Sequence, residues 1–321
     1  MKAFRCRVCD APLYFENSVC VSCGSALGYW REERAIVPVD AEGRYVAADG
    51  LIWHVCRNLN LSGCTWLARL EGGQCEACDL TRVRPNDADL TGLANFVPAE
   101  RAKRHLVAEL DRLGLGTEGL AFDLLSSERQ PVVTGHVDGV ITIDLAESDT
   151  AHREGLRAQL AEPYRTLLGH FRHEIGHFFQ CRLVRTDAAP ARFRELFGDP
   201  DADYRAARDR HYAEGPPADW PVSFISAYAA MHPFEDFAET WAHLMHILDT
   251  VDTAVAYGLV DEARVTGIDL RMLVTKVWVP LSTALNLVNR SMGKDDLYPF
   301  AIPAPVLDKL EFAASLLPFD R

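Results

Sequence analysis

The chain has 321 residues, 48% of them hydrophobic and 25% charged, and its 33 Lys+Arg against 46 Asp+Glu give a formal net charge of −13. This composition excludes a disordered chain and a collagen-like repeat, and the acidic balance argues against a nucleic-acid surface along the whole chain, because phosphate binding depends on Lys and Arg. At roughly 150 residues per domain, the length predicts about two domains.

The start of the sequence predicts neither a signal peptide nor a membrane span. It is polar and already contains Cys6 and Cys9. No window of about 18 uncharged apolar residues occurs further along the chain. We therefore expect a cytoplasmic protein with no membrane partner.

Eight of the nine cysteines lie in the first quarter of the chain, which indicates metal binding rather than disulfides when no secretory signal is predicted. They form two sets: Cys6, Cys9, Cys20 and Cys23, and then Cys56, Cys64, Cys75 and Cys78. The first set has two C-x-x-C knuckles, which predict a zinc ribbon with one closed structural zinc site. Only the last two cysteines of the second set have knuckle spacing, so a second structural zinc and free or redox-active thiols both stay open.

Turn-forming residues at positions 84–89 follow the last cysteine pair and mark a domain boundary. We expect a zinc-ribbon region at residues 1–88 and a second domain at residues 89–321. Residues 1–83 contain 9 Lys+Arg and 10 Asp+Glu, so they offer no basic stripe. This balance favours a protein-recruiting or regulatory role for the ribbon region, and nucleic acid is the less favoured partner.

Strand patterns occur early in the second domain. Residues 119–125 and 132–134 read as strands, and Asp138-Gly139 predicts a hairpin turn before a strand from Val140 to Asp144. Hydrogen bonding to the edge of a sheet can hold an extended peptide largely independently of its side chains, and Val140–Asp144 is the candidate edge strand for such binding. An ordinary half-buried strand is the competing interpretation.

Helical periodicity dominates the rest of the chain. The predicted helices cover Pro98 to Leu113, Thr150 to Leu183 with a fresh start at Pro163, Phe224 to Leu248, and much of Asp269 to Leu317. The polar stretch from Phe193 to Trp220 predicts an irregular insert. Together these elements predict an α+β fold.

Residues 173–177 read His-Glu-Ile-Gly-His inside a predicted helix. Because positions i and i+4 of a helix share one face, His173 and His177 can present two imidazoles to one tetrahedral zinc ion. Glu174 then lies beside the metal, where its carboxylate can take the proton of a zinc-activated water. Gly176 indicates that another element packs closely at this point. Two core histidines and a surface glutamate are the competing interpretation.

A catalytic zinc typically has three protein ligands, so a third is needed downstream. Residues 232–243 carry Glu235 and Glu239 one helical turn apart among apolar side chains. One carboxylate can bind zinc while the other orients a ligand imidazole through its free N–H. The residues alone do not decide which carboxylate takes which role, and a solvated acidic face is the alternative.

These two motifs resemble those of the gluzincin metallopeptidases, in particular the branch that includes anthrax lethal factor. In that branch a tyrosine stands seven residues before the first Glu of a Glu-x-Phe-Ala-Glu helix, and Tyr228 stands seven before Glu235. The resemblance implies that Glu235 is the third ligand and that Glu239 orients a ligand histidine. It also implies that Tyr228 donates a proton to the oxyanion of the tetrahedral intermediate, with a buried core tyrosine as the alternative.

Nearly the whole chain resembles bacterial zinc-binding metallopeptidases that carry an amino-terminal zinc-ribbon region. The matching stretches are residues 120–123, 135–143, 162–165 and 289–292. The resemblance implies a zincin-like domain preceded by zinc-ribbon modules, with one catalytic zinc and one or two structural zinc ions. It says little about the substrate.

The remaining histidines and the last cysteine do not carry a second site. His170, His232, His243 and His246 lie near the motifs in sequence, and packed residues are the favoured interpretation for each. Cys181 has no evident partner for nucleophilic catalysis, so a buried inert thiol is favoured.

The sequence therefore predicts a zinc-dependent metallopeptidase with a peptide or protein substrate and a ribbon region for recruitment or regulation. The main alternative is a protein- or nucleic-acid-binding protein whose zincin domain is a platform of low activity. A third possibility keeps zinc-dependent hydrolysis but moves it to a non-peptide amide.

Overall fold

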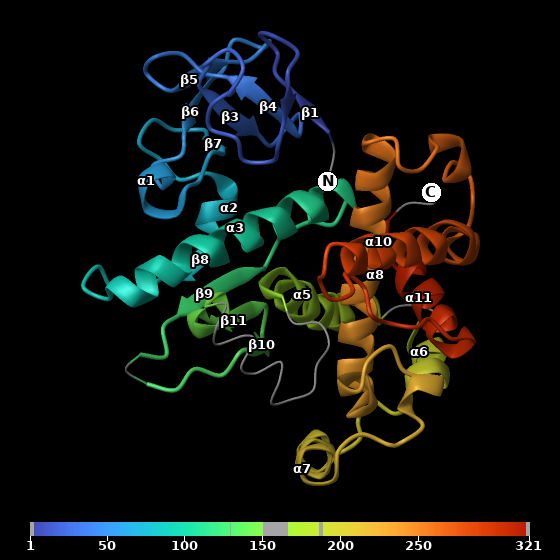
Figure 1. Cartoon of the computed structure of the whole chain (residues 1–321). Coiled ribbons are helices and arrows are strands. Elements are labelled where there is room, and N and C mark those ends of the chain that lie inside the picture. The colour runs from blue at the N-terminus through green and yellow to red at the C-terminus, as the bar shows by residue number, and fades with distance from the viewer. Residues whose placement is uncertain (1–2, 129, 150–165, 186–188, 319–321) are drawn as a thin grey trace. The chain divides into compact units, whose positions relative to one another are not determined.

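The computed structural model describes residues 3–128, 130–149, 166–185 and 189–318, drawn in colour in Figure 1. The chain divides into two compact units, one of Met1–Arg112 with Gly116–His152 and one of Leu113–Leu115 with Arg153–Arg321. The first unit contains the cysteine-rich region, a long helix and a four-stranded sheet. The second contains helices α5 to α11. Mixed helix and sheet agree with the predicted α+β class.

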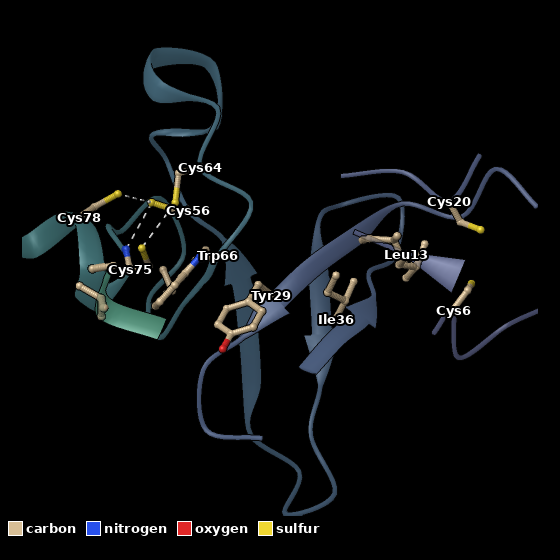
Figure 2. Close-up of a cluster of buried hydrophobic side chains, with 14 residues drawn as sticks. Cys6, Leu13, Cys20, Tyr29, Ile36, Cys56, Cys64, Trp66, Cys75 and Cys78 are labelled. Carbon is tan, nitrogen blue, oxygen red and sulfur yellow. Dashed lines mark hydrogen bonds between the residues drawn. The ribbon is translucent and has the colours of Figure 1, made fainter. Parts of the chain in front are cut away.

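Short strands and single-turn helices make up the cysteine-rich region. They are β1 (Phe4–Arg5), β2 (Pro12–Leu13), β3 (Leu27–Trp30), β4 (Ala35–Pro38), β5 (Arg44–Val46), β6 (Ile52–Val55), α1 (Leu59–Ser62), β7 (Leu67–Ala68), α2 (Glu76–Asp79) and β8 (Thr81–Val83). β1 pairs with β2, β3 pairs with β4, and β5, β6 and β7 form an antiparallel sheet. Figure 2 shows Tyr29 and Trp66 between the two groups of cysteines, with ring centroids 4.6 Å apart. One small core therefore supports both groups.

Helix α3 (Leu90–Arg112) begins eight residues earlier than predicted. Asp89 provides the start, because its side chain accepts a hydrogen bond of 2.7 Å from the backbone N–H of Gly92. Pro98, which we expected to begin the helix, lies inside it. The capping aspartate was the correct start signal, and the proline was misleading.

Buried ion pairs attach the cysteine-rich region to α3. Lys103 is fully buried and its Nζ lies 2.7 Å from Oε1 of Glu100, which also accepts a bond of 2.6 Å from Thr81 at the start of β8. Arg104, which is 1% exposed, forms an ion pair with Glu16. Buried charges are tolerated only when they are paired, so Arg104 depends on Glu16 of the cysteine-rich region. Lys103 is paired within α3, and this pair contacts the region through Thr81.

The sheet has the order β10-β11-β9-β8, formed by β9 (Ala121–Leu125), β10 (Gly135–Val137), β11 (Val140–Asp144) and β8 from the cysteine-rich region. The predicted hairpin is confirmed, since β10 and β11 are antiparallel and Asp138 and Gly139 have φ of 48° and 83°. Its first strand occupies 135–137 rather than 132–134. The predicted edge position of β11 is wrong: β10 covers one side and β9 the other, so both hydrogen-bonding edges are used. A 3₁₀ turn, η1 (Leu145–Ser148), follows.

The described residues of the second unit form helices joined by turns and loops, with no strand. Its elements are α5 (Leu167–Leu183), α6 (Ala189–Phe197), α7 (Tyr204–Glu214), η2 (Trp220–Val222), η3 (Tyr228–Ala230), α8 (Pro233–Ala256), η4 (Glu262–Arg264), α9 (Leu270–Met272), the π-helical η5 (Leu273–Trp278), α10 (Val279–Ser291) and α11 (Ala304–Ser315). Among the helices of the described residues, none combines the length and apolar character needed to cross a membrane.

Two predictions in this unit are wrong, an irregular insert and the start of a helix, and a third lies partly outside the described residues. The expected insert at 193–220 contains most of α6 and all of α7, because apolar Phe193 and Phe197 bury one face of α6 and Asp203 caps α7. The helix expected from Phe224 begins only at Pro233, since proline at the first position forces the preceding residue into an extended conformation. The expected start at Pro163 and the matching stretch 162–165 lie outside the described residues.

Helices α5 and α8 pack at very close range, as Gly176 suggested (Figure 1). A Cβ placed on Gly176 would lie 2.9 Å from the Cα of Ala238 and 3.1 Å from the Cβ of Trp241. Both are rigid parts of α8, so neither can move aside. The glycine therefore sets the separation of the two helices that carry the candidate site.

Gly176→Ala is expected to lower both thermal stability and zinc retention at this site. The added methyl group forces α5 and α8 apart, at a typical overpacking cost of about 1–3 kcal/mol, which exceeds the gain of about 0.5–1 kcal/mol from replacing a helical glycine. Thermal unfolding and metal analysis measure both effects. Gly135→Ala is the control, because a Cβ there meets nothing within 4 Å. Unchanged stability and zinc content in Gly176→Ala would contradict the prediction.

Candidate functional site

Helix α5 presents the two predicted histidine ligands on one face. Thr166 caps the helix by accepting a bond of 3.0 Å from the N–H of Gly169, so the residues that follow are in regular helix. The Nε2 atoms of His173 and His177 lie 3.1 Å apart. Phe234 stacks on the His177 ring, with centroids 4.2 Å apart and planes inclined by 13°. The sequence spacing and this stacking together aim both imidazoles at one point.

Glu235 of α8 supplies the third atom at this point. Its Oε2 lies 2.9 Å from Nε2 of His173 and 3.4 Å from Nε2 of His177. Zinc bonds of about 2.0–2.1 Å at the tetrahedral angle would place ligand atoms about 3.3–3.4 Å apart. The observed triangle of 2.9, 3.1 and 3.4 Å therefore fits a zinc ion.

Glu239 lies on the other side of the His173 ring. Its Oε1 is 2.7 Å from Nδ1 of His173, and its Oε2 accepts a bond of 2.6 Å from the hydroxyl of Ser226. If His173 donates its Nδ1 proton to this carboxylate, the lone pair of its Nε2 faces the convergence point. The two carboxylates therefore lie on opposite sides of the His173 ring, Glu235 beside Nε2 and Glu239 beside Nδ1. Ser226, which holds Glu239, was not predicted.

The pKa values of His173, Glu235 and Glu239 are shifted by two opposing effects, burial and the attraction between opposite charges. Burial alone lowers the pKa of His173, but the carboxylates of Glu235 and Glu239 outweigh it and raise that pKa well above the ordinary value. Burial likewise opposes ionisation of the two glutamates. Even so, His173 lowers the pKa of Glu239 to about 2. His173 and His177 together lower the pKa of Glu235 well below its usual range. Both carboxylates are therefore ionised at neutral pH.

Glu174 is buried beside this cluster and has one oxygen without a partner in the described part of the chain. Burial raises its pKa, while the charges of His173 and His177 oppose the rise. An unpaired oxygen on a buried carboxylate lowers the stability of the fold, so its presence needs an explanation such as a catalytic role. This is the environment expected for a group that accepts and returns a proton.

Among the described residues, Tyr228 and Tyr204 lie near the cluster of His173 and Glu235, and only Tyr228 was predicted. Tyr228, in η3, is half-buried, with its ring centroid 5.9 Å from that of His173. Tyr204, the first residue of α7, donates a hydrogen bond of 2.8 Å to Oε1 of Glu235. Burial raises the pKa of both phenols, and Glu235 adds to the rise, so both stay protonated. Tyr204 was missed because its segment was expected to be an irregular insert.

The other histidines of α8 are structural. His232 caps the helix by accepting a bond of 3.1 Å from the N–H of Phe234. His243 is buried, its Nδ1 lies 2.8 Å from the hydroxyl of Tyr298, and burial lowers its pKa to about 4. His246 contacts Arg172, a residue that also forms an ion pair of 2.9 Å with Asp249. These packed roles agree with the sequence interpretation, and Cys181 is a half-buried free thiol.

The two cysteine sets each converge as closely as one zinc ion requires. In the first set, Sγ–Sγ distances are 3.7 Å for Cys6–Cys23 and for Cys9–Cys20. In the second set they are 3.7 Å for Cys56–Cys78 and 3.6 Å for Cys64–Cys75, marked in Figure 2. Zinc–thiolate bonds of about 2.3 Å at the tetrahedral angle predict about 3.8 Å. The second set is therefore a complete four-cysteine site, although only half of it has knuckle spacing.

Comparisons with known proteins agree with this geometry. The family model described as "Putative zinc-binding metallo-peptidase" matches residues 92–316, and a model described as "zinc-ribbon domain" matches residues 3–89. The chain belongs to this metallopeptidase family. Its family membership and its four-cysteine sites both support zinc binding.

Relatives of this chain occur in mycobacteria. The chain is 50% identical over 329 residues to proteins of Mycobacterium bovis (strain ATCC BAA-935 / AF2122/97) and Mycobacterium tuberculosis (strain ATCC 25618 / H37Rv). Each alignment covers 97% of this chain and 94% of the relative, and each relative is described as an uncharacterized protein. No solved structure matches the chain.

Proposed function

We propose that this protein is a zinc-dependent metallopeptidase that hydrolyses peptide bonds. The observation that carries the proposal is the convergence of Nε2 of His173, Nε2 of His177 and Oε2 of Glu235 at distances suited to one zinc ion. Family membership supports zinc chemistry at this position. Three protein ligands leave a fourth position for the reaction, whereas the four-cysteine sites are closed.

In this proposal each side chain has one task. Zinc, when bound, lowers the pKa of water toward neutrality and polarises the carbonyl group. Glu174 takes the proton of the attacking water and passes it to the leaving amine, for which its unpaired buried oxygen is suited. Glu239 fixes the His173 ring in the orientation that directs Nε2 to the metal.

Tyr228 is the proposed donor to the oxyanion. Its phenol stays protonated because burial raises its pKa, so it can stabilise negative charge that develops on the substrate oxygen. Its ring centroid lies 5.9 Å from that of His173, which supports this assignment.

The ribbon region is proposed to recruit or regulate, with a protein as the favoured partner. Exposed apolar side chains favour protein contact over phosphate contact: Val21, in the second knuckle, is 93% exposed, and Tyr14, between the two knuckles, is 69% exposed.

Cleavage of a mixed peptide pool by the full-length protein tests the activity. We expect zinc-loaded protein to produce defined fragments by mass spectrometry, 1,10-phenanthroline to stop their formation, and added zinc to restore it. Buffer with zinc alone is the control for metal-catalysed cleavage. If zinc-loaded protein gives no fragment from the pool, the peptidase proposal fails and the binding-platform alternative stands.

A further inference from the structure

The two oxygens of Glu235 have different surroundings. Oε2 lies 2.9 Å from Nε2 of His173, at the convergence point. Oε1 accepts the hydroxyl hydrogen of Tyr204 at 2.8 Å. A carboxylate without such a partner is free to bind a metal ion through both oxygens, which would occupy an additional coordination position. The hydroxyl of Tyr204 therefore competes with the metal for one of the two oxygens.

We propose that Tyr204 is a positioning residue that restricts Glu235 to binding zinc through Oε2 alone. The inference rests on the proposed function only in taking Glu235 as a ligand. By holding Oε1, Tyr204 keeps the fourth coordination position available for the reaction. It also adds a charge-assisted hydrogen bond that fixes the rotamer of a ligand on α8.

The chain around Tyr204 is fastened to the start of α8, which gives the hydroxyl a defined position. Nδ1 of His232 accepts the N–H of Phe234 at 3.1 Å, so this nitrogen carries no proton. The proton is therefore on Nε2, which donates to the carbonyl of Ala202 at 3.0 Å. The rings of His232 and Tyr204 also pack edge to face, with centroids 5.3 Å apart.

Helix α7 has one further ring contact, between His211 and Tyr228, with centroids 6.0 Å apart. Asp203 caps α7 through the N–H of Ala206 at 3.0 Å, and Ala207 is the buried residue of the helix. The Tyr204 side chain consequently links a mostly exposed helix to a metal ligand. Removal of its hydroxyl should release Oε1 without displacing the ring that packs on His232.

Tyr204→Phe in the full-length protein, with cobalt(II) at the histidine site, tests the proposal. Zinc is retained in the four-cysteine sites, the third metal is withdrawn with a chelator, and cobalt is added. Metal analysis verifies the loading, and absence of a sulfur-to-cobalt charge-transfer band verifies the location. We expect weaker visible absorption in Tyr204→Phe than in the wild type, because five-coordinate cobalt absorbs less than four-coordinate cobalt. We also expect zinc affinity to fall by about 10–100-fold.

Tyr212→Phe is the matched control, because this tyrosine is on the same helix, is 63% exposed and makes no described hydrogen bond to Glu235. It should keep the wild-type spectrum and affinity. Tyr204→Phe is also combined with Glu235→Gln, whose amide offers a single ligand oxygen. In that background Tyr204→Phe should change the spectrum no further.

Three results would overturn the inference: an unchanged spectrum and affinity in Tyr204→Phe, an equal change in Tyr212→Phe, or an additional change in the Glu235→Gln background. All these readouts are independent of turnover. If the wild type cleaves no peptide, the proposed activity fails, yet the spectrum and the affinity still decide the role of Tyr204.

Discussion

Replacement of Glu174 by glutamine is expected to reduce peptide cleavage by about 10²–10⁴-fold while the protein keeps its zinc content. Glutamine has nearly the same shape but cannot accept a proton from the attacking water. Glu174 is not part of the converging group of His173, His177 and Glu235, so its replacement should leave these three proposed ligands in place. The measurement is the initial rate of fragment formation from one peptide found in the pool, together with zinc per chain.

Glu174→Gln also removes a buried carboxyl group that is harder to ionise because it is buried. We therefore expect Glu174→Gln to be at least as stable as the wild type in thermal unfolding. A loss of rate with intact stability and zinc content would separate a proton-transfer role from a structural one. Cleavage at the wild-type rate by zinc-loaded Glu174→Gln would contradict the proposed mechanism.

The ligand spacing could be predicted from the sequence because it depends on local periodicity. His173 and His177 are four residues apart on one helix, and so are Glu235 and Glu239. Helical geometry alone then places each pair on one face. Gly176 also indicated close packing of another element on α5, because α8 occupies the space that a Cβ at this position would need.

Features that depend on contacts between distant segments could not be predicted. Tyr204 is 31 residues from Glu235, and nothing in its polar neighbourhood indicates that its hydroxyl faces a carboxylate. The position of β11 also depends on a distant partner, because β9 pairs with it in parallel through a connection that the alternating pattern does not reveal. The sequence also could not show that Glu235 and Glu239 lie at different nitrogens of His173, because this depends on the direction of the His173 ring.

The attachment of the ribbon region to α3 has a consequence for experiments on domain function. Point substitutions in the full-length chain are preferable to deletion of residues 1–88, because deletion would remove β8 together with two contacts of α3. These are the ion pair of buried Arg104 with Glu16 and the hydrogen bond from Thr81 to Glu100. Unpaired buried charges typically cost several kcal/mol, so the remaining chain would lose stability for reasons unrelated to regulation. Substitutions at exposed Tyr14 and Val21 test recruitment without this loss.

Cys64→Ser is expected to remove one zinc per chain and to lower the free energy of unfolding by more than about 4 kcal/mol. Cys64 is fully buried, its Sγ lies 3.6 Å from that of Cys75, and a serine hydroxyl is a poor zinc ligand at neutral pH. The loss should extend beyond the ribbon, because Sγ of Cys78 lies 3.9 Å from Oε2 of Glu100 on α3. Chemical denaturation and metal analysis measure the two effects.

Cys181→Ser is the matched control, because this half-buried thiol on α5 belongs to neither four-cysteine set. It should keep all the zinc and most of the stability. If Cys64→Ser kept the wild-type zinc content and unfolding free energy, the second set would not be a structural zinc site. The sequence alternative of free or redox-active thiols would then replace it.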